Sequence, residues 1–184
     1  MASSLAHALF PTAIGLCGIA WGQGGITAVQ LPEAAPEATR RRLLQWAGAC
    51  PASEAPPDAV RAAMEGVQAL LQGEPRQLLE VALDGARLTP FQQRVYAITR
   101  GIPPGQTLTY GEVARELGDA KLARAVGQAL GFNPFAPVVP CHRVLAAGNR
   151  SGGFSAHGGA VTKWRMLAIE GFEAGGTRPL FPSL

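Results

Sequence analysis

Three adjacent side chains, Cys141, His142 and Arg143, have the types and the order that nucleophilic chemistry needs. They follow a strand-like segment, 137–140, that begins and ends with a proline. A cysteine attacks as its thiolate, and an ordinary thiol, with a pKa of about 8.5, is only a few per cent ionised at neutral pH. A histidine can take the proton, directly or through a water, if an acceptor holds its other ring nitrogen. The run therefore predicts a cysteine nucleophile with His142 as its base.

A candidate acceptor for His142 lies near the C-terminus. The sequence pattern predicts a helix over residues 163–170, which places Glu170 in its last turn. A carboxylate there opposes the helix dipole by about 0.3–1 kcal/mol, so Glu170 is expected to have a local partner. The buried face of this helix is expected to hold Trp164, Leu167 and Ala168.

These observations suggest a Cys141–His142–Glu170 relay. The same residue types also fit an inert buried cysteine, a histidine that satisfies a backbone group, and an exposed glutamate, so the pattern alone leaves these alternatives open.

The composition favours a protein that folds without metals or disulfides. Of 184 residues, 47% are hydrophobic, which is enough for a sizeable core. The three cysteines, Cys17, Cys50 and Cys141, are odd in number, lack CxxC spacing and are accompanied by only three histidines. We therefore expect no metal, no cofactor and a reducing, cytoplasmic location.

The opening segment is uncharged up to Glu33, but it lacks the features of a signal peptide or a membrane span. No Lys or Arg precedes its apolar run, and Pro11 and several glycines interrupt it. Strands of a soluble protein are expected here, and no membrane partner.

Charge divides unevenly along the chain. Residues 1–86 hold five basic and eight acidic residues, a net charge of −3, whereas residues 87–184 hold eleven and five, a net charge of +6. The second half could therefore favour a polyanion, although an ordinary solvated surface would give the same imbalance.

The first half combines strand and helix signals. Residues 12–21 and 24–31 are rich in β-forming residues and are joined by a turn at Gly22-Gln23, which predicts a hairpin. Two segments have helical periodicity, 37–47 and 58–71, and a further strand is expected over 78–83. Asp84-Gly85 ends that strand, so we place a domain boundary there, between residues 1–86 and 87–184.

The second half begins with strong helix signals. Thr89 with Gln92, and Thr109 with Glu112, have the spacing of capping boxes at two helix starts. The second of these helices is expected to stop at Gly118. A further helix from Leu122 follows after a Gly-Asp turn, and its apolar face consists of Leu122, Ala125, Val126, Ala129 and Leu130. This arrangement is typical of a helix-turn-helix, although any tight helical hairpin gives the same pattern.

Five separate motifs together resemble the methylated-DNA–protein-cysteine methyltransferases over residues 88–172. They are Thr109–Glu112, Ala123–Gly127, Asn133-Pro134, Pro140–Val144 and Gly152–Ser155. The first half resembles the N-terminal domain of that family more loosely. The resemblance implies an α/β (α+β) fold, with an N-terminal ribonuclease-H-like α/β domain followed by a mainly helical, winged helix-turn-helix-like domain that binds DNA and carries the catalytic residues.

The resemblance also implies roles for single residues. Cys141 would accept the alkyl group, with His142 as the base and Glu170 orienting it. Tyr110 would donate a proton or hydrogen bond to the departing guanine, and Asn133 would brace the turn that holds the site. The reaction would use no cofactor and occur once per molecule.

The implied partner is double-stranded DNA that contains O6-alkylguanine, with O4-alkylthymine as a second candidate, bound by a monomer through the minor groove. Arg124 would fill the space left by a flipped nucleotide. The small residues Ala123, Ala125 and Gly127 would allow the helix to approach the DNA, and Ser155 would contact the base.

Two features depart from the family pattern. Phe154 stands where many relatives have a tyrosine, and the loop 155–161 is longer than in relatives; both could alter the tolerance for bulky alkyl groups. His7, Cys17 and Cys50 do not form the zinc ligand set that some relatives have near the N-terminus.

Three other functions compete with alkyl transfer. An alkyltransferase-like lesion binder would keep the fold but lack the nucleophile, which Cys141 argues against. A helix-turn-helix regulator would need a sensor domain, and a cysteine hydrolase would need an oxyanion loop; the sequence shows neither.

Overall fold

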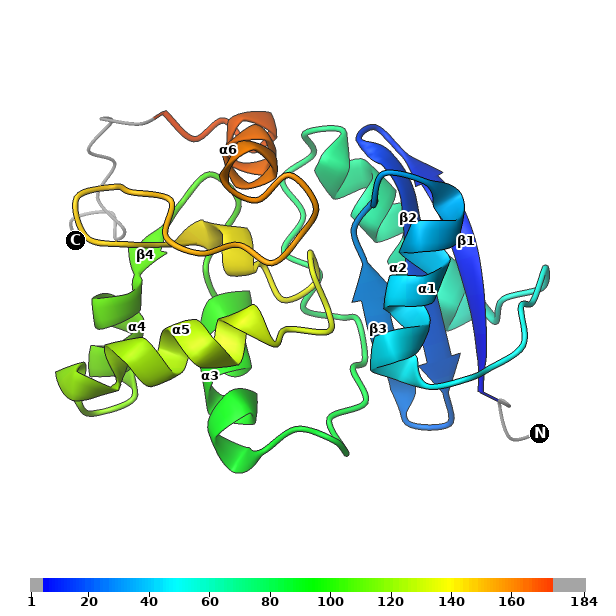
Figure 1. Ribbon diagram of the computed structural model, residues 1–184, viewed down its shortest axis with the longest axis horizontal. Coiled ribbons are helices and arrows are strands. Elements are labelled where there is room, and N and C mark those ends of the chain that lie inside the picture. Colours follow the sequence, from blue (N-terminus) through cyan, green and yellow to red (C-terminus); the bar gives the residue numbers. More distant parts are fainter. Residues whose placement is uncertain (1–4, 174–184) are drawn as a thin grey trace.

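An antiparallel three-stranded sheet in the order β1-β2-β3 forms the centre of the N-terminal region (Figure 1). This is seen in a computed structural model that describes residues 5–173. The strands are β1 (Ala6–Thr12), β2 (Gly15–Gly22) and β3 (Gly25–Gln30).

The predicted hairpin is present, but the prediction that Thr12 starts a strand is wrong. Thr12 ends β1, and its hydroxyl donates to Gly15 O at 2.7 Å across a tight turn, so β2 begins only at Gly15. At the second turn Gly25 has φ +117°, and a Cβ there would lie 2.5 Å from Ala82 O. That position requires glycine.

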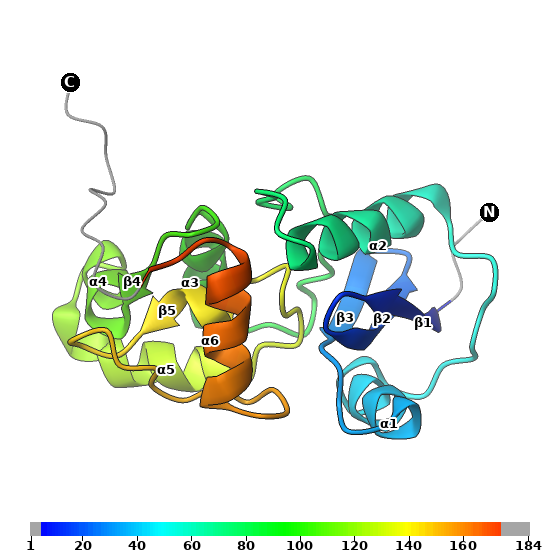
Figure 2. The same cartoon turned by 90° about the horizontal axis from the view of Figure 1, so that it is seen from above.

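Two helices cover opposite faces of this sheet, α1 (Pro36–Ala47) on one side and α2 (Asp58–Leu71) on the other (Figure 2). Both lie where the periodicity predicts helices, and α1 begins one residue earlier, with Pro36 in its first turn. The core between the sheet and α2 is apolar; it includes Phe10, Cys17, Ile19, Val67 and Leu70.

The strand predicted over residues 78–83 is not formed. Leu78 has a positive φ of 57°, which breaks an extended run, and only Leu83 forms a bridge, to Ile26. Leu78 packs into the core instead of pairing with a neighbouring strand. It is 2% exposed, and its side chain occupies the position that a Cβ at Gly66 would need. An apolar run reports burial, and it does not by itself distinguish a strand from a buried turn.

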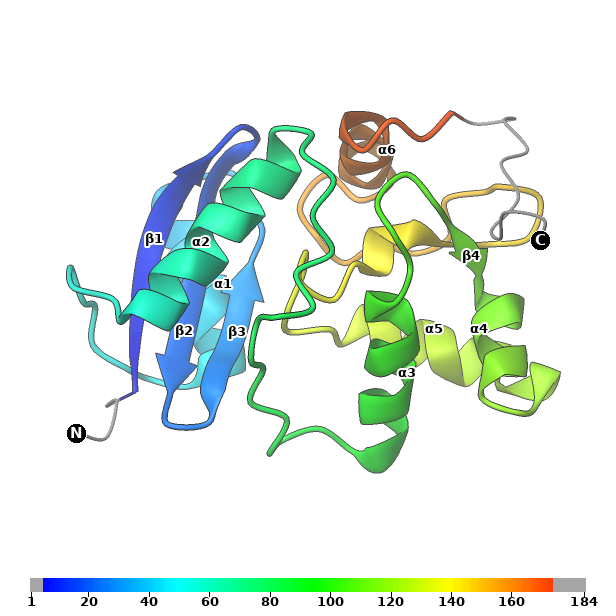
Figure 3. The same cartoon turned by 180° about the vertical axis from the view of Figure 1, so that it is seen from behind.

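The C-terminal region is mainly helical (Figure 3). Its α-helices are α3 (Pro90–Arg100), α4 (Tyr110–Glu116), α5 (Ala123–Gly131) and α6 (Ala160–Ile169). A short parallel pair, β4 (Leu108–Thr109) and β5 (Val144–Leu145), joins distant segments. Both predicted capping boxes are confirmed, with Thr89 at α3 and Thr109 at α4.

Helices α4 and α5 form a tight hairpin. After Gly118 the chain makes a short 3-10 turn, Ala120–Leu122, whose first turn is capped by Asp119, so α5 starts one residue later than predicted. On the predicted apolar face of α5, Val126, Ala129 and Leu130 are buried. The other two residues of this face, Leu122 and Ala125, are half-buried.

Helix α6 begins three residues before the predicted start, and one of its predicted core residues is wrong. Ala168 is exposed, Trp164 is half-buried and stacks on Phe172, and only Leu167 is buried as expected. The buried face is completed by Lys163 and Met166 instead. Hydrophobicity alone places Ala168 inside. Lys163, Met166 and Leu167 are spaced three and four residues apart and share the buried face, and Ala168 lies outside it.

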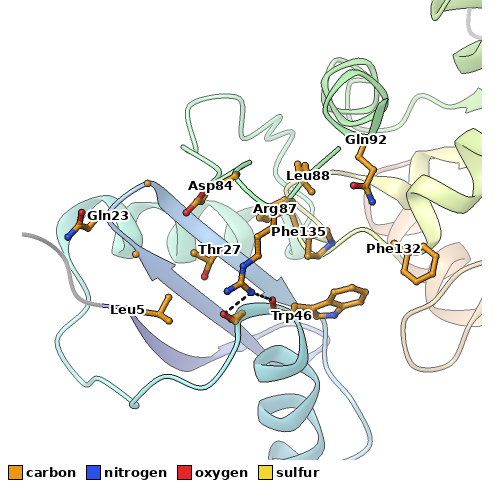
Figure 4. A pocket seen from close by; sticks show the side chains of 15 residues that line it. Leu5, Gln23, Thr27, Trp46, Asp84, Arg87, Leu88, Gln92, Phe132 and Phe135 are labelled. Carbon is orange, nitrogen blue, oxygen red and sulfur yellow. Dashed lines mark hydrogen bonds between the residues drawn. The ribbon is translucent and has the colours of Figure 1, made fainter. Parts of the chain in front are cut away.

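The two regions touch through backbone and side-chain contacts. Val29 N on β3 donates to Pro134 O at 2.8 Å, and Arg87 donates to Trp46 O and Ala47 O at the end of α1 (Figure 4). No helix within residues 5–173 is long and apolar enough to cross a membrane.

Candidate active site

Cys141 opens a short 3-10 turn, Cys141–Arg143, directly before β5. Cys141 is 6% exposed. Cys141 N donates to Val139 O at 2.8 Å, and Val139 N donates to Phe135 O at 3.0 Å, so the segment before the thiol is held by its own backbone.

Asn133 braces the same turn from inside the protein. Its side-chain Nδ2 donates to Val139 O at 2.8 Å, and its Oδ1 accepts from Phe135 N at 3.0 Å. The nitrogen and the oxygen of this buried side-chain amide are thus both used, and they tie together the segment from Asn133 to Val139 that leads to Cys141.

Glu170 is the C-cap of α6 and lies in a buried polar network. Its Oε1 is 2.7 Å from His142 Nε2, and Arg143 donates from Nε to Oε2 at 3.0 Å and from Nη2 to Oε1 at 2.8 Å. Gly105 N donates to Oε2 at 3.2 Å, and Arg143 Nη1 donates to Ile102 O at 2.6 Å. The expected local partner of Glu170 is therefore present, and there are two.

The charges in this network shift the acidities of its members. Burial raises the pKa of Glu170, but His142 and Arg143 lower it more, and the result is about 2. Burial lowers the pKa of His142; Glu170 opposes this shift, while Arg143 and Lys163 add to it. Near neutral pH the network thus contains a carboxylate, a guanidinium and a neutral imidazole.

His142 Nδ1, the ring nitrogen that faces away from Glu170, is buried and has no hydrogen-bond partner among the described residues. Within residues 5–173, no hydrogen bond joins Cys141 Sγ to the His142 ring. Of the two routes that the sequence left open for the proton, the geometry therefore favours a bridging group over direct transfer.

Burial raises the pKa of the Cys141 thiol, while the Asn133 side chain, the Lys163 ammonium, and the backbone amides of Cys141 and His142 lower it. The net shift is upward, so the resting form is the thiol. Reaction then requires a base that removes the proton as the substrate binds.

Lys163 is a second buried cation beside the thiol. Its Nζ donates to Val144 O at 2.6 Å and to Gly153 O at 3.4 Å, and it lies 5.7 Å from the centre of the Tyr110 ring. Burial lowers its pKa to about 8, although Cys141 opposes the shift. Sequence reasoning missed Lys163; the signal was its place four residues before Leu167, on the buried face of α6.

Arg143 was also missed as a member of the site, although it belongs to the run that carries the nucleophile. It is 1% exposed, and a fully buried arginine needs a carboxylate partner. Only the position of Glu170, distant in sequence, reveals that partner.

Cys141 forms part of the floor of a hollow of about 900 Å³ between the α4–α5 hairpin and the loop after β5. Tyr110 at the start of α4 lies on its wall, and its hydroxyl donates to Gly153 O at 3.3 Å. Burial, and to a lesser degree Cys141, raise the pKa of Tyr110, so its hydroxyl keeps its proton. Gly152 has φ +63°, and a Cβ there would lie 2.8 Å from the Tyr110 ring.

The structure brings most of the predicted residues to this hollow. Its lining includes Tyr110, Ala123, Arg124, Gly127, Cys141 and Ser155, together with Phe154. Asn133, His142, Glu170 and Ala125 are not on the lining. Within residues 5–173 no group of three or more His, Cys, Asp or Glu side chains could hold a metal ion.

A separate hollow of about 640 Å³ lies between the two regions and does not include Cys141. Figure 4 shows Trp46, Phe132 and Phe135 on its walls, with Arg87 crossing it toward the end of α1. Its lining includes Thr27, Asp84 and Arg87, but no cysteine or histidine.

The fold and the site define a protein with a buried cysteine on the lining of a hollow beside a helical hairpin. Residues 90–172 match the family model described as "6-O-methylguanine DNA methyltransferase, DNA binding domain". The chain belongs to the methylated-DNA–protein-cysteine methyltransferase family of enzymes.

Individual relatives support this assignment. The chain is 33% identical over 159 residues to the methylated-DNA–protein-cysteine methyltransferase of Methanothermobacter thermautotrophicus, covering 86% of this chain and 81% of that one. It is 43% identical over 107 residues to a DNA base-flipping protein of Thermus thermophilus, covering 58% of this chain and 70% of that one. The crystal structure of Mycobacterium tuberculosis OGT in complex with DNA is 33% identical, with a TM-score of 0.69 over 90% of this chain and 92% of that chain.

Proposed function

We propose that this protein repairs DNA by moving the alkyl group from O6-alkylguanine, with O4-alkylthymine as a second candidate, onto Cys141, once per molecule. The observation that carries the proposal is the position of Cys141, which lines an open hollow and directly precedes, in the chain, the two residues that form a buried network with Glu170. An inert core cysteine needs neither feature.

The proton leaves the thiol first. A water between Cys141 Sγ and His142 Nδ1 would relay it, since that nitrogen is the one without a protein partner within the described residues. Glu170 has too low a pKa to take the proton; it orients the imidazole and stabilises the imidazolium that forms. Arg143 keeps Glu170 in place.

The thiolate then attacks the alkyl carbon, the carbon–O6 bond breaks, and its electron pair moves into the guanine ring. Tyr110, which keeps its proton, would donate a hydrogen bond or that proton to the departing base. Lys163 would hold the Tyr110 ring and loop residue Gly153 in place. The product is a thioether on Cys141 and an unmodified guanine.

A base inside a duplex cannot reach a buried thiol, so the nucleotide must leave the stack. The small residues Ala123 and Gly127 line the hollow, and with Ala125 they would allow α5 to approach a narrow minor groove closely. Arg124 is exposed at this entrance and would fill the vacated space, while Ser155 would contact the flipped base.

The remaining assignments complete this proposal. We infer a ribonuclease-H-like domain over residues 1–86 and a winged helix-turn-helix-like domain over 87–184, acting as a monomer in the cytoplasm without a cofactor. The α4–α5 hairpin, and the sheet with a helix on each face, support the two fold assignments.

The test is incubation with duplex DNA that carries a radiolabelled methyl group on guanine O6. Label should move to the protein in at most one equivalent, on the peptide that contains Cys141. Repeated turnover, or repair without a modified Cys141, would contradict the mechanism. A lesion binder or a regulator would leave all label on DNA.

Base flipping is tested separately by Arg124→Ala. Because flipping costs a few kcal/mol, this variant should repair duplex DNA much more slowly and still react normally with free O6-benzylguanine. Tyr110→Phe should instead slow both reactions. If Arg124→Ala lost the same factor on both substrates, Arg124 would act on chemistry or folding.

A further inference from the structure

Helix α1 carries a basic surface in an otherwise acidic region. Residues 36–47 hold three basic residues, Arg40, Arg41 and Arg42, and one acidic residue, Glu37, a net charge of +2. The rest of residues 1–86 holds two basic and seven acidic residues, a net charge of −5. Positive charge in the N-terminal region is therefore concentrated on one helix.

The three arginines of α1 are not used inside the described part of the protein. Arg40 and Arg41 are exposed, and within residues 5–173 no hydrogen bond or ion pair engages their side chains or that of Arg42. Arg42 is half-buried, and its guanidinium lies 5.7 Å from the centre of the Trp46 ring. Stacking on an aromatic ring orients a guanidinium and leaves its N–H groups able to donate to a ligand.

Helix α1 also borders the catalytic surface. It lies on the same side of the molecule as α5, whereas α2 and α3 lie on the opposite side (Figures 1, 2 and 3). Trp46 near the end of α1 and Phe132 at the C-cap of α5 line the same hollow between the two regions (Figure 4). Arg42 lines a small crevice with residues 154–156, a loop that also contributes to the hollow at Cys141.

The spacing of the arginines decides which of them face this border. Successive residues of an α-helix are turned by about 100°, so Arg40 and Arg42 point about 160° apart. Arg42 shares a face with Trp46, four residues on, and this face meets the loop 154–156. Arg40 therefore points away from the catalytic surface, and Arg41 lies between the two on the outward face of the helix.

We propose that Arg41 and Arg42 bind phosphates of the duplex that flanks the damaged nucleotide, so that the N-terminal region extends the DNA interface beyond α5. The inference rests on the proposed function. A duplex seated on α5 continues past the damaged nucleotide in both directions, and toward the N-terminal region it meets the arginines of α1. The planar guanidinium fork can donate two parallel hydrogen bonds to one phosphate.

The salt dependence of DNA binding tests these contacts. Each phosphate that a protein cation neutralises adds about 0.9 to the slope of log binding constant against log salt concentration. On a long, lesion-free duplex, Arg41→Gln and Arg42→Gln should each lower the magnitude of this slope by about 0.9, and the double variant by about twice as much. Arg42→Lys should keep the slope, because lysine retains the charge.

Arg40→Gln is the matched control. It removes the same charge from an exposed position on the same helix, but on the side that faces away from the catalytic surface. Its slope should equal that of the unaltered protein. An equal fall in Arg40→Gln would assign the effect to the overall charge of α1 and overturn the contacts, as would unchanged slopes in Arg41→Gln and Arg42→Gln.

Rates of methyl transfer locate the contacts on the DNA. With a long duplex that carries O6-methylguanine, at limiting protein and low salt, Arg41→Gln/Arg42→Gln should react about tenfold more slowly than the unaltered protein. With a duplex cut to a few base pairs on both sides of the lesion, and with free O6-benzylguanine, the two proteins should react equally. Equal slowing on all three substrates would place the arginines in folding or chemistry and overturn the proposal.

The proposed function fails in a different way. If the unaltered protein transferred no alkyl group from any of the three substrates, alkyl transfer would be wrong. The salt slopes of the α1 variants would still decide whether Arg41 and Arg42 bind phosphates.

Discussion

The two regions each bury a cysteine, yet they surround it differently. Cys17 on β2 lies in an apolar core, where burial raises its pKa to about 12 and Thr12 is its one polar neighbour in the described chain. Cys141 is buried as well, but the Asn133 amide and the Lys163 ammonium act on its thiol, and it lines a hollow. A thiol that is buried among apolar groups is unreactive. Polar or cationic neighbours, together with a path by which a substrate can reach the sulfur, make a thiol reactive.

The same contrast holds for the whole of each region. The buried cationic side chains within residues 5–173, Arg143 and Lys163, both belong to the C-terminal region. Such groups are expensive to bury and are retained where they are paired. The N-terminal region contributes an apolar scaffold, and at Arg42 a charge at its edge.

The largest expected effect tests the two cysteines against each other. Cys141→Ser should reduce methyl transfer by several orders of magnitude while DNA binding survives. The reason is that a neutral hydroxyl is a much poorer nucleophile than a thiolate. Cys17→Ala should keep full transfer stoichiometry and cost about 1–2 kcal/mol of unfolding free energy. Labelled-methyl transfer and urea unfolding measure the two. Loss of transfer in Cys17→Ala at intact fold would break the comparison.

The next effect concerns the buried ion pair. Arg143→Met should lower the free energy of unfolding by about 3–5 kcal/mol, because Glu170 and its charge stay buried without their main partner. Arg61→Met in the exposed pair with Asp58 is the control and should cost less than about 1 kcal/mol.

If the single variant does not fold, the double variant Arg143→Met/Glu170→Met keeps the test open, because removing both charges should recover stability relative to either single change. Equal losses for Arg143→Met and Arg61→Met in denaturant unfolding would show that burial does not distinguish the two pairs.

A smaller effect appears in acid. The pKa of Glu170 lies at about 2, below the ordinary 4.5, so its carboxylate stabilises the fold fully above pH 4.5 and loses this contribution as the pH falls from 4.5 through about 2. The shift corresponds to roughly 3 kcal/mol. His142, whose pKa is lowered by burial, adds a loss that starts below its ordinary value of 6.5.

Glu170→Gln should therefore flatten the fall of unfolding free energy between about pH 4.5 and 2. Urea unfolding at a series of pH values measures the slope. A variant as steep as the unaltered protein in this window would assign the acid sensitivity to other carboxylates.

The smallest effect compares helix starts in the two regions. Helix α3 has a capping box at Thr89. In contrast, the N-cap residue of α1, Ala35, makes no side-chain hydrogen bond to the first turn within the described residues. Thr89→Ala should cost about 1 kcal/mol, and Ala35→Ser should stabilise by a similar or smaller amount, because a hydroxyl can accept from a free N–H of the first turn. Thermal unfolding measures both. Stabilisation by Thr89→Ala would contradict this account.

Local signals in the sequence predicted the two capping boxes at α3 and α4 and the turn of the hairpin, because capping and turn residues act within a few positions. The apolar run at 78–83 misled, since hydrophobicity reports burial without direction. Ala168 was misplaced for a related reason: a small apolar residue satisfies either face of α6.

The sequence by itself determined the run Cys141–Arg143 and the order of the motifs around it. Only the tertiary structure decided which charges face the thiol. Glu170 meets His142 and Arg143 across separations of 28 and 27 residues. Periodicity can show that a residue is buried, but the partner that makes a buried charge tolerable is fixed by how the elements pack against each other.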